Sequence, residues 1–166
     1  MEYLSGTDLT RFLRAGGQSD AFVAHVLFQV ASSLTEAHSR GVIHRDIKPG
    51  NILGTFEDGK PVVKIIDFGI AKTSISQLNT ETGVVKGTIA YMSPEQLHAE
   101  ALDVRSDLFS LGGVLYELCT GQRPFSGHNF TSLMMAILTK PSAPPSSLRK
   151  DMPEGLNKLI LQVLEK

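Results

Sequence analysis

Apolar residues recur at helical spacing early in the chain. After Ser19 they follow one another at intervals of three and four residues as far as Ala37, which predicts an amphipathic helix with one buried face. Ser19 is a suitable N-cap, and Gly41 stands where a left-handed residue ends a helix. A shorter helix is predicted over residues 7–17, between a Thr-Asp cap and a Gly-Gly end.

The middle of the chain predicts short strands followed by a loop. Apolar pieces at residues 42–43, 52–53 and 62–66 are separated by turn residues such as those at 58–59, and this pattern predicts small strands. Residues 71–91 are polar and rich in threonine, which predicts a loop.

The last third of the chain returns to a helical pattern. Residues 108–120 are almost all apolar and are followed by Gly121, which predicts a helix buried on most sides. Two more helices are predicted over 131–139 and 156–165, with a proline-rich stretch at 141–145 between them. The fold class is therefore expected to be α+β and mostly α-helical.

Composition adds few constraints. The 166 residues can form one domain with a core, and the net charge of −1 gives no support for a nucleic-acid partner. The single cysteine, Cys119, cannot form an internal disulfide and is expected to be a buried thiol. The N-terminus lacks the pattern of a signal peptide, and no apolar run approaches the roughly 20 residues of a membrane span. The chain as given is expected to be soluble.

Three short segments carry the candidate chemistry. They are His-Arg-Asp-Ile-Lys-Pro-Gly-Asn at 44–51, Asp-Phe-Gly at 67–69 and Ser-Pro-Glu at 93–95. Each tripeptide alone is weak evidence, but the ordered set is specific, with a lysine two residues after Asp46 and an asparagine five after it. The set resembles the catalytic loop, metal-binding loop and end of the activation segment of eukaryotic-like, Hanks-type Ser/Thr protein kinases, chiefly bacterial ones. The resemblance covers the whole chain, 1–166, and implies the large C-terminal lobe of a protein kinase-like fold.

The resemblance assigns roles to named residues. Phosphoryl transfer leaves the protein little covalent work, so positioning and charge neutralisation dominate. Asp46 is the expected acceptor of the substrate hydroxyl proton, and Lys48 is expected to offset the charge of the transferred phosphate. Asn51 completes the catalytic set, and Asn51 and Asp67 supply hard oxygen ligands for Mg²⁺ or Mn²⁺ bound with ATP.

Nucleotide contacts are expected from residues 1–6 and from the predicted strands. Residues 1–6 resemble the kinase hinge, whose backbone bonds adenine, while two apolar strand residues would form the floor under the base. The expected contacts are Glu2, Leu4, Asp8 (for the ribose), Leu53 and Ile66. No Gly-x-Gly-x-x-Gly motif occurs in the sequence. The small N-lobe is therefore expected to be absent, and the isolated chain to bind nucleotide weakly and to turn over negligibly.

Residues 67–95 resemble an activation segment. Within it, Thr80 and Thr82 are expected autophosphorylation sites, and Arg45 places a cation where a phosphorylated loop residue could pair. Thr88 is expected to bond the catalytic aspartate and lysine and to favour Ser/Thr substrates.

Four further positions are expected to be structural. Asp107 matches a buried anchor for the catalytic-loop backbone, and His44 and Phe68 match an apolar packing pair. Glu95 ordinarily pairs with an arginine in a later helix, for which the chain offers no convincing candidate.

Two other function classes remain open. The first is a non-catalytic, kinase-like binding or scaffold module, which the lack of an N-lobe favours and the complete catalytic set opposes. The second is a small-molecule phosphotransferase of the aminoglycoside-kinase type, which Lys48 and residues 68–69 and 91–96 fit less well.

The leading interpretation also implies partners. They are protein substrates with Ser/Thr acceptors, the protein's own N-lobe and, as an option, a second kinase domain. Neither nucleic acid nor a membrane segment is expected for this chain. A cytoplasmic location is expected, with a membrane anchor elsewhere in a full-length protein left open.

Overall fold

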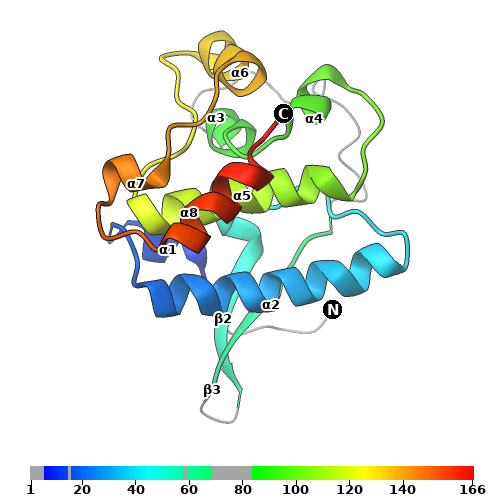
Figure 1. Cartoon of the computed structure of the whole chain (residues 1–166). Helices are drawn as coiled ribbons and strands as arrows, with labels where there is room; N and C mark the ends of the chain where they lie inside the picture. The colour runs from blue at the N-terminus through cyan, green and yellow to red at the C-terminus, as the bar shows by residue number, and fades with distance from the viewer. Residues whose placement is uncertain (1–5, 15, 58–59, 69–83) are drawn as a thin grey trace.

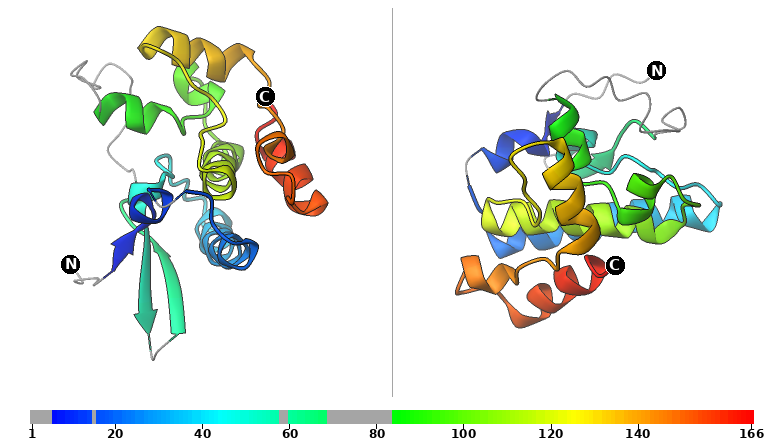
Figure 2. Two further views of the ribbon diagram at one scale, coloured as in Figure 1. Left: turned by 90° about the vertical axis from the view of Figure 1, so that its left-hand side faces the viewer. Right: turned by 90° about the horizontal axis from the view of Figure 1, so that it is seen from above.

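One long helix, α5 (Val104–Thr120), forms the centre of the computed structural model (Figure 1). The structure describes residues 6–14, 16–57, 60–68 and 84–166. Helix α2 (Asp20–Ser39) runs along one side of α5, and α8 (Glu154–Val163) packs against another. The hairpin of β2 (Ile52–Glu57) and β3 (Lys60–Ile65) projects beside α2, and α6 (Phe130–Thr139) lies at the opposite end of the molecule (Figure 2).

Helix α2 confirms the first predicted helix. The Ser19 side chain accepts a hydrogen bond from the Phe22 N–H and caps the helix. Gly41 follows its end with φ 72°, the left-handed conformation that the sequence predicted. The buried side chains of this helix follow the predicted spacing, and they are Val23, Val26, Val30 and Leu34.

Helix α5 is longer than predicted. It begins at Val104 because the Asp103 side chain accepts from the Arg105 N–H, and it ends at Gly121 with φ 72° as expected. A Cβ on Gly112 would lie 2.6 Å from Cγ2 of Val163 in α8, so glycine permits this close helix contact. Cys119 in the same helix is buried, as predicted, and burial raises the pKa of its thiol to about 11.

The sheet contains three antiparallel strands in the order β1-β2-β3. Strands β2 (Ile52–Glu57) and β3 (Lys60–Ile65) confirm the predicted strands at 52–53 and 62–66. Strand β1 (Thr7–Asp8) was not predicted, and it pairs Asp8 with Leu53. The predicted strand at 42–43 is wrong, because the Val42 N–H donates to the Ala37 carbonyl and closes the end of α2 instead.

The shortest helices were missed or only partly predicted. Helix α1 (Leu9–Leu13), capped by Asp8, confirms the predicted helix over 7–17 in a shorter form. Helix α3 (Val84–Ile89) corrects the prediction of a continuous loop over 71–91. Helices α4 (Pro94–His98) and α7 (Pro145–Leu148) both begin with proline, which suits the first turn of a helix.

Helices and a small sheet together agree with the predicted α+β class. None of the helices in the described part of the chain combines the length and the apolar content that crossing a membrane requires.

Candidate active site

The octet at 44–51 forms a tight loop between α2 and β2, ending in a 3₁₀ turn, Pro49–Asn51. Lys48 Nζ lies 2.9 Å from Oδ2 and 3.2 Å from Oδ1 of Asp46. The Asn51 side-chain amide donates to the Asp46 carbonyl at 2.8 Å and to Asp46 Oδ2 at 3.0 Å. The Asp46 side chain is only 8% exposed. These contacts hold its carboxylate in one orientation. Because the amide nitrogen of Asn51 faces Asp46, its amide oxygen points to a different side.

Two hydrogen bonds attach Ile66, the residue before Asp67, to the octet. The Ile66 N–H donates to the Asn51 carbonyl at 2.9 Å, and the Ile66 carbonyl accepts from His44 Nε2 at 3.0 Å. Asp67 follows directly, is exposed, and has φ 57°, a left-handed conformation that is uncommon outside glycine. The backbone therefore places Asp67 directly after a residue that is hydrogen-bonded to Asn51 and His44.

His44 is a structural part of this junction. Its Nε2 must be the protonated nitrogen, because the Ile66 carbonyl can only accept, and its Nδ1 accepts from the Asp46 N–H at 3.3 Å. Burial lowers the pKa of His44, while the hydrogen bond to Ile66 and the charges of nearby aspartates act in the opposite direction. Its ring centroid lies 4.6 Å from that of Phe68, which confirms the predicted packing contact.

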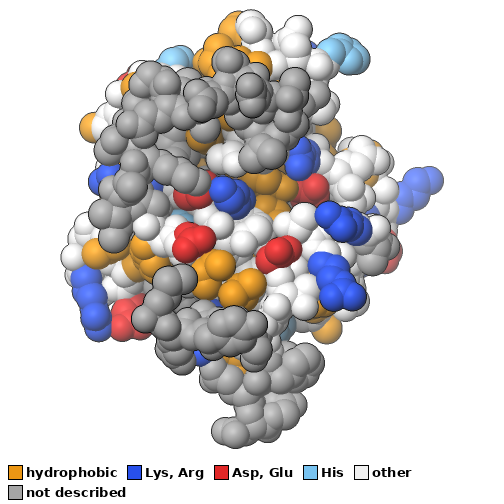
Figure 3. Space-filling view, turned by 180° about the vertical axis from the view of Figure 1, so that it is seen from behind, with side chains coloured by type: hydrophobic (Ala, Val, Ile, Leu, Met, Phe, Trp, Pro, Cys, Tyr) orange, Lys and Arg blue, Asp and Glu red, His pale blue; other side chains and the backbone are white. Residues whose placement is uncertain are grey.

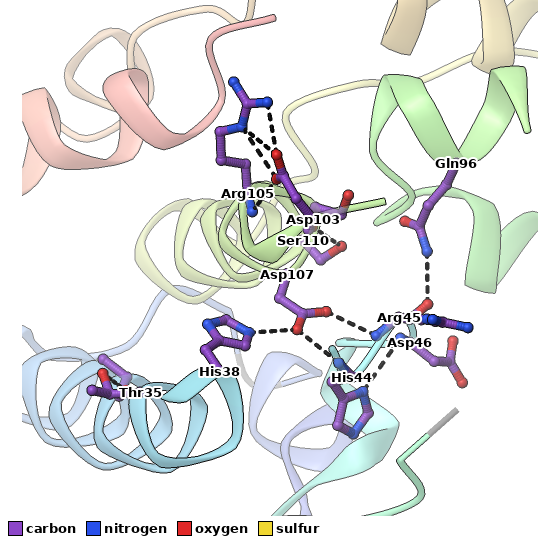
Figure 4. Close-up of polar contacts among 12 residues, drawn as sticks. Thr35, His38, His44, Arg45, Asp46, Gln96, Asp103, Arg105, Asp107 and Ser110 are labelled. Atoms are coloured by element: carbon purple, nitrogen blue, oxygen red, sulfur yellow. Dashed lines mark hydrogen bonds and ion pairs between the residues drawn. The ribbon is translucent and has the colours of Figure 1, made fainter. Parts of the chain in front are cut away.

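Asp107 of α5 supports the octet from one side (Figure 4). Its carboxylate is 1% exposed. Oδ2 accepts from the His44 N–H and from His38 Nε2, and Oδ1 accepts from the Arg45 N–H, each at 2.8 Å. Arg45 has φ 68°, and a non-glycine residue in this region costs about 1–2 kcal/mol. The contacts confirm the predicted anchor, and they add His38, which sequence reasoning missed.

Gln96 of α4 holds the octet from another side (Figure 4). Its side-chain amide nitrogen donates to the Arg45 carbonyl at 2.7 Å. Its amide oxygen accepts from the Ser93 N–H at 3.0 Å, and the Ser93 side chain accepts from the Gln96 N–H. A Ser-x-x-Gln sequence is a known capping signature, so the sequence could have indicated the cap, but not the bond to Arg45.

Thr88 reaches the octet from the end of α3. Its Oγ1 lies 3.5 Å from Lys48 Nζ, so the structure brings together these two predicted residues. Glu95, near by in sequence, accepts a hydrogen bond from the Ser106 hydroxyl.

The predicted nucleotide-binding residues are only partly described. Leu53 is half-buried in β2, opposite Asp8 in β1. Asp8 Oδ1 accepts from the Thr10 N–H at 2.9 Å and caps α1, so helix capping engages one of its oxygens. Ile66 is half-buried, and its backbone is bonded to Asn51 and His44 of the octet. Outside the described residues lie Glu2, Leu4, Thr80 and Thr82.

The arrangement has a definite chemical capacity. It offers a fixed carboxylate that can accept a proton, a lysine cation beside it, and hard oxygen donors on Asn51 and Asp67. Seen from behind, one face of the molecule carries acidic and basic side chains close together around apolar atoms (Figure 3). The carboxylate, the lysine and the oxygen donors together suit the transfer of an anionic group between oxygen atoms in the presence of a divalent cation.

Comparison with known proteins agrees with this capacity. The sequence model described as "Protein kinase domain" matches residues 1–166. The chain is 39% identical, over its whole length, to a probable serine/threonine-protein kinase of Clostridium acetobutylicum, of which it covers 25%. It is 36% identical over its whole length to serine/threonine-protein kinase PknB of Mycobacterium tuberculosis, covering 26% of that protein.

Another relative carries a different name. The tyrosine-protein kinase MasK of Myxococcus xanthus is 40% identical over 99% of this chain, which covers 27% of it. The chain thus spans about a quarter of the length of these relatives.

Proposed function

Because the chain belongs to the protein kinase domain family, we propose that it carries the phosphotransfer site of a Ser/Thr protein kinase. The enzyme moves the γ-phosphoryl group of ATP to hydroxyl groups of protein substrates. The observation that supports this most is the mutual contact of Asp46, Lys48 and Asn51, with Asp67 joined to them through the Ile66 backbone.

Each residue has its own role in the phosphoryl transfer. Asp46 orients the substrate hydroxyl and takes its proton, while the hydroxyl oxygen bonds to the γ-phosphorus and the bond from that phosphorus to the bridging oxygen of ADP breaks. Lys48, 2.9 Å from Asp46, offsets the negative charge of the group in transfer. Asn51 fixes the Asp46 carboxylate through its amide nitrogen.

The donors present fit a divalent cation. Asn51 turns its amide nitrogen to Asp46, which leaves a hard oxygen for Mg²⁺ or Mn²⁺, and Asp67 supplies an exposed carboxylate. Magnesium is commonly held by one or two such groups together with substrate phosphates. When bound, it would neutralise charge on the phosphates.

Metal dependence gives a direct test. Removing divalent cations with EDTA should abolish transfer of labelled phosphate from ATP, and added Mg²⁺ or Mn²⁺ should restore it. Asp67→Asn should raise the Mg²⁺ concentration for half-maximal rate by at least about tenfold, because one charged ligand is lost. Asp103→Asn is the matched control, since Asp103 is an exposed carboxylate paired with Arg105. Equal metal requirements in the two variants would contradict the proposed ligand.

The proposed nucleotide contacts are Glu2, Leu4, Asp8, Leu53 and Ile66. The half-buried positions of Leu53 and Ile66 next to the octet support a role as the adenine floor. The 166 residues contain no glycine-rich phosphate loop, so by themselves they should bind nucleotide weakly and turn over slowly. A nucleotide-clamping small lobe is therefore among the proposed partners, together with protein substrates and a second kinase domain. The proposed location is the cytoplasm, where ATP is available.

Regulation through the activation segment, residues 67–95, is the second part of the proposal. Both backbone groups of Arg45 are bonded, to Asp107 and to Gln96, while its side chain is exposed. An exposed guanidinium on a fixed backbone is suited to pair with a phosphorylated residue.

The proposed phosphorylation sites are Thr80 and Thr82. Mass spectrometry of the active protein, purified as the cell makes it, should find phosphate on at least one of them. The double variant Thr80→Ala with Thr82→Ala should be about tenfold less active, because the Arg45 side chain loses its anionic partner. The matched control is Thr131→Ala, an exposed threonine on α6. An active enzyme without phosphate on either residue would remove this part of the proposal.

Phosphate transfer to tyrosine residues of the protein substrate is the second candidate function, because one relative is named a tyrosine-protein kinase. The contact between Lys48 and Thr88 supports Ser/Thr acceptors in this chain. Phosphoamino-acid analysis of a labelled protein substrate separates the two: phosphoserine and phosphothreonine are expected, and phosphotyrosine alone would favour the second candidate.

A further inference from the structure

The peptide group between Arg45 and Asp46 is hydrogen-bonded at both of its polar atoms. Its carbonyl accepts from the side-chain amide nitrogen of Gln96 at 2.7 Å, and its N–H donates to His44 Nδ1 at 3.3 Å. Because a peptide group is planar, these two bonds fix the rotation of the whole plane. The plane ends at Cα of Asp46, which carries the catalytic carboxylate, so Gln96 acts one peptide group away from the proposed proton acceptor.

Helix α4 holds Gln96 in place. The Ser93 hydroxyl accepts from the Gln96 N–H, and the Gln96 amide oxygen accepts from the Ser93 N–H. At the other end of the helix the Glu100 N–H donates to the Glu95 carbonyl at 2.9 Å, and Ala99 has φ 55°, as is typical of a left-handed C-cap. The two ends of the Gln96 amide therefore have different roles, since the oxygen closes its own helix and the nitrogen holds the octet.

Contacts among α4, the octet and α5 form a closed loop. Glu95 accepts from the Ser106 hydroxyl of α5. Gln96, the next residue, donates to the Arg45 carbonyl, and the neighbour of Ser106, Asp107, accepts from the Arg45 N–H (Figure 4). Ser106 and Asp107 are each only 1% exposed. The position of α4 on α5 is therefore transmitted to the peptide group after Arg45 through the Gln96 side chain.

We propose that Gln96 is a positioning residue for Asp46. Asp107 bonds the N–H of Arg45, which belongs to the preceding peptide group, so it leaves the rotation about the Cα–C bond of Arg45 unset. Gln96 sets this rotation and thereby keeps the Asp46 carboxylate turned toward the substrate hydroxyl. The inference rests on the proposed kinase function and deepens it. Residues 94–95 of α4 are the end of the activation segment, so the placement of that segment reaches the proton acceptor through Gln96.

Gln96→Glu and Gln96→Lys separate the two roles of the side chain. Glutamate keeps an oxygen for the Ser93 N–H but has no donor for the Arg45 carbonyl, whereas lysine keeps a donor and lacks the oxygen. The assay uses ATP and dephosphorylated casein with the protein as the cell makes it. We expect kcat of Gln96→Glu to fall about tenfold, because a small misplacement of a catalytic group has effects of at least this order.

The other constants distinguish positioning from a structural role. KM for ATP and KM for casein should stay within about twofold in Gln96→Glu, since no contact with either substrate is removed. Its melting temperature should stay near that of the wild-type protein, because the capping box is intact. Gln96→Lys should show the reverse, with a lower melting temperature and at least about half of the wild-type kcat.

Gln162→Glu is the matched control. It makes the same change from amide to carboxylate on an exposed glutamine of α8, and it should leave kcat and both KM values unchanged. The inference is overturned if Gln96→Glu keeps the kcat of an active wild-type protein, or if Gln96→Glu and Gln96→Lys lose kcat equally. Absence of transfer by the wild-type protein would instead contradict the proposed function.

Discussion

Asp46→Asn is expected to lower kcat for phosphate transfer about 10³-fold, because general base catalysis contributes on that order. The amide has nearly the same shape and can still accept from Asn51, so the loop should keep its conformation. It cannot take up a proton, and it loses the charge that faces Lys48 at 2.9 Å. Transfer of labelled phosphate to casein measures the effect.

The control for Asp46→Asn must show that folding is intact. The melting temperature and the affinity for ATP should remain near those of the wild-type protein, and Asp103→Asn should keep full activity. If Asp46→Asn kept more than about a tenth of the wild-type kcat, Asp46 would not be the proton acceptor.

Asp107→Asn is expected to lower the free energy of unfolding by about 3–5 kcal/mol. The buried carboxylate accepts from the His44 N–H, the Arg45 N–H and His38 Nε2. An asparagine presents N–H groups to at least one of these donors, which would leave buried hydrogen-bonding groups unpaired. If the amide nitrogen faces Arg45, that residue also loses the contact that holds it at φ 68°. Urea unfolding of the purified protein gives the change.

Asp103→Ala provides the comparison for Asp107→Asn. Asp103 caps the same helix, and its side chain is 51% exposed. Loss of such a cap costs about 1 kcal/mol. If the two variants were destabilised equally, the contacts of Asp107 would contribute no more to stability than an exposed cap does.

These predictions share a structural basis: side chains of two helices hold the backbone of the octet. Asp107 of α5 and Gln96 of α4 bond to it directly, and His38 of α2 bonds to Asp107. Asp107 binds the N–H of Arg45 and Gln96 binds its carbonyl, so the residue before Asp46 is fixed at both backbone groups. A carboxylate positioned in this way needs little reorganisation when a substrate binds. Such positioning is the main way in which a protein promotes phosphoryl transfer.

Part of the fold could be predicted from local sequence alone. Ser19 and Gly41 mark the ends of α2, and Gly121 marks the end of α5, because caps act over a few residues. Strand β1 could not be found, since its partner β2 lies far along the chain. The strand predicted at 42–43 failed because the Val42 N–H was needed at the end of α2.

The site, like the fold, could be predicted only in part from the sequence. Asp46, Lys48 and Asn51 lie within one octet, and the resemblance of this octet to the kinase catalytic loop predicted that they act together. His38 contacts Asp107, and Gln96 contacts Arg45, only because separate helices meet there. No local pattern indicates such contacts.

The contacts among Tyr91, Glu117 and Arg123 are another tertiary feature. Glu117 stands out in the sequence only as a charged residue within an apolar helix. Its contacts with Tyr91 and Arg123 depend on the packing of the turn at 88–91 against α5.

The proposed site requires that Asp46, Asn51 and Asp67 meet at the terminal phosphate of a metal-bound nucleotide. A crystal structure of the protein, as the cell makes it, with Mg²⁺ and a non-hydrolysable ATP analogue tests it most directly. We expect Mg²⁺ about 2.1 Å from an oxygen of Asn51 and of Asp67, with the γ-phosphate facing Asp46. A γ-phosphate bound away from Asp46, or a metal held by other residues, would contradict the claim.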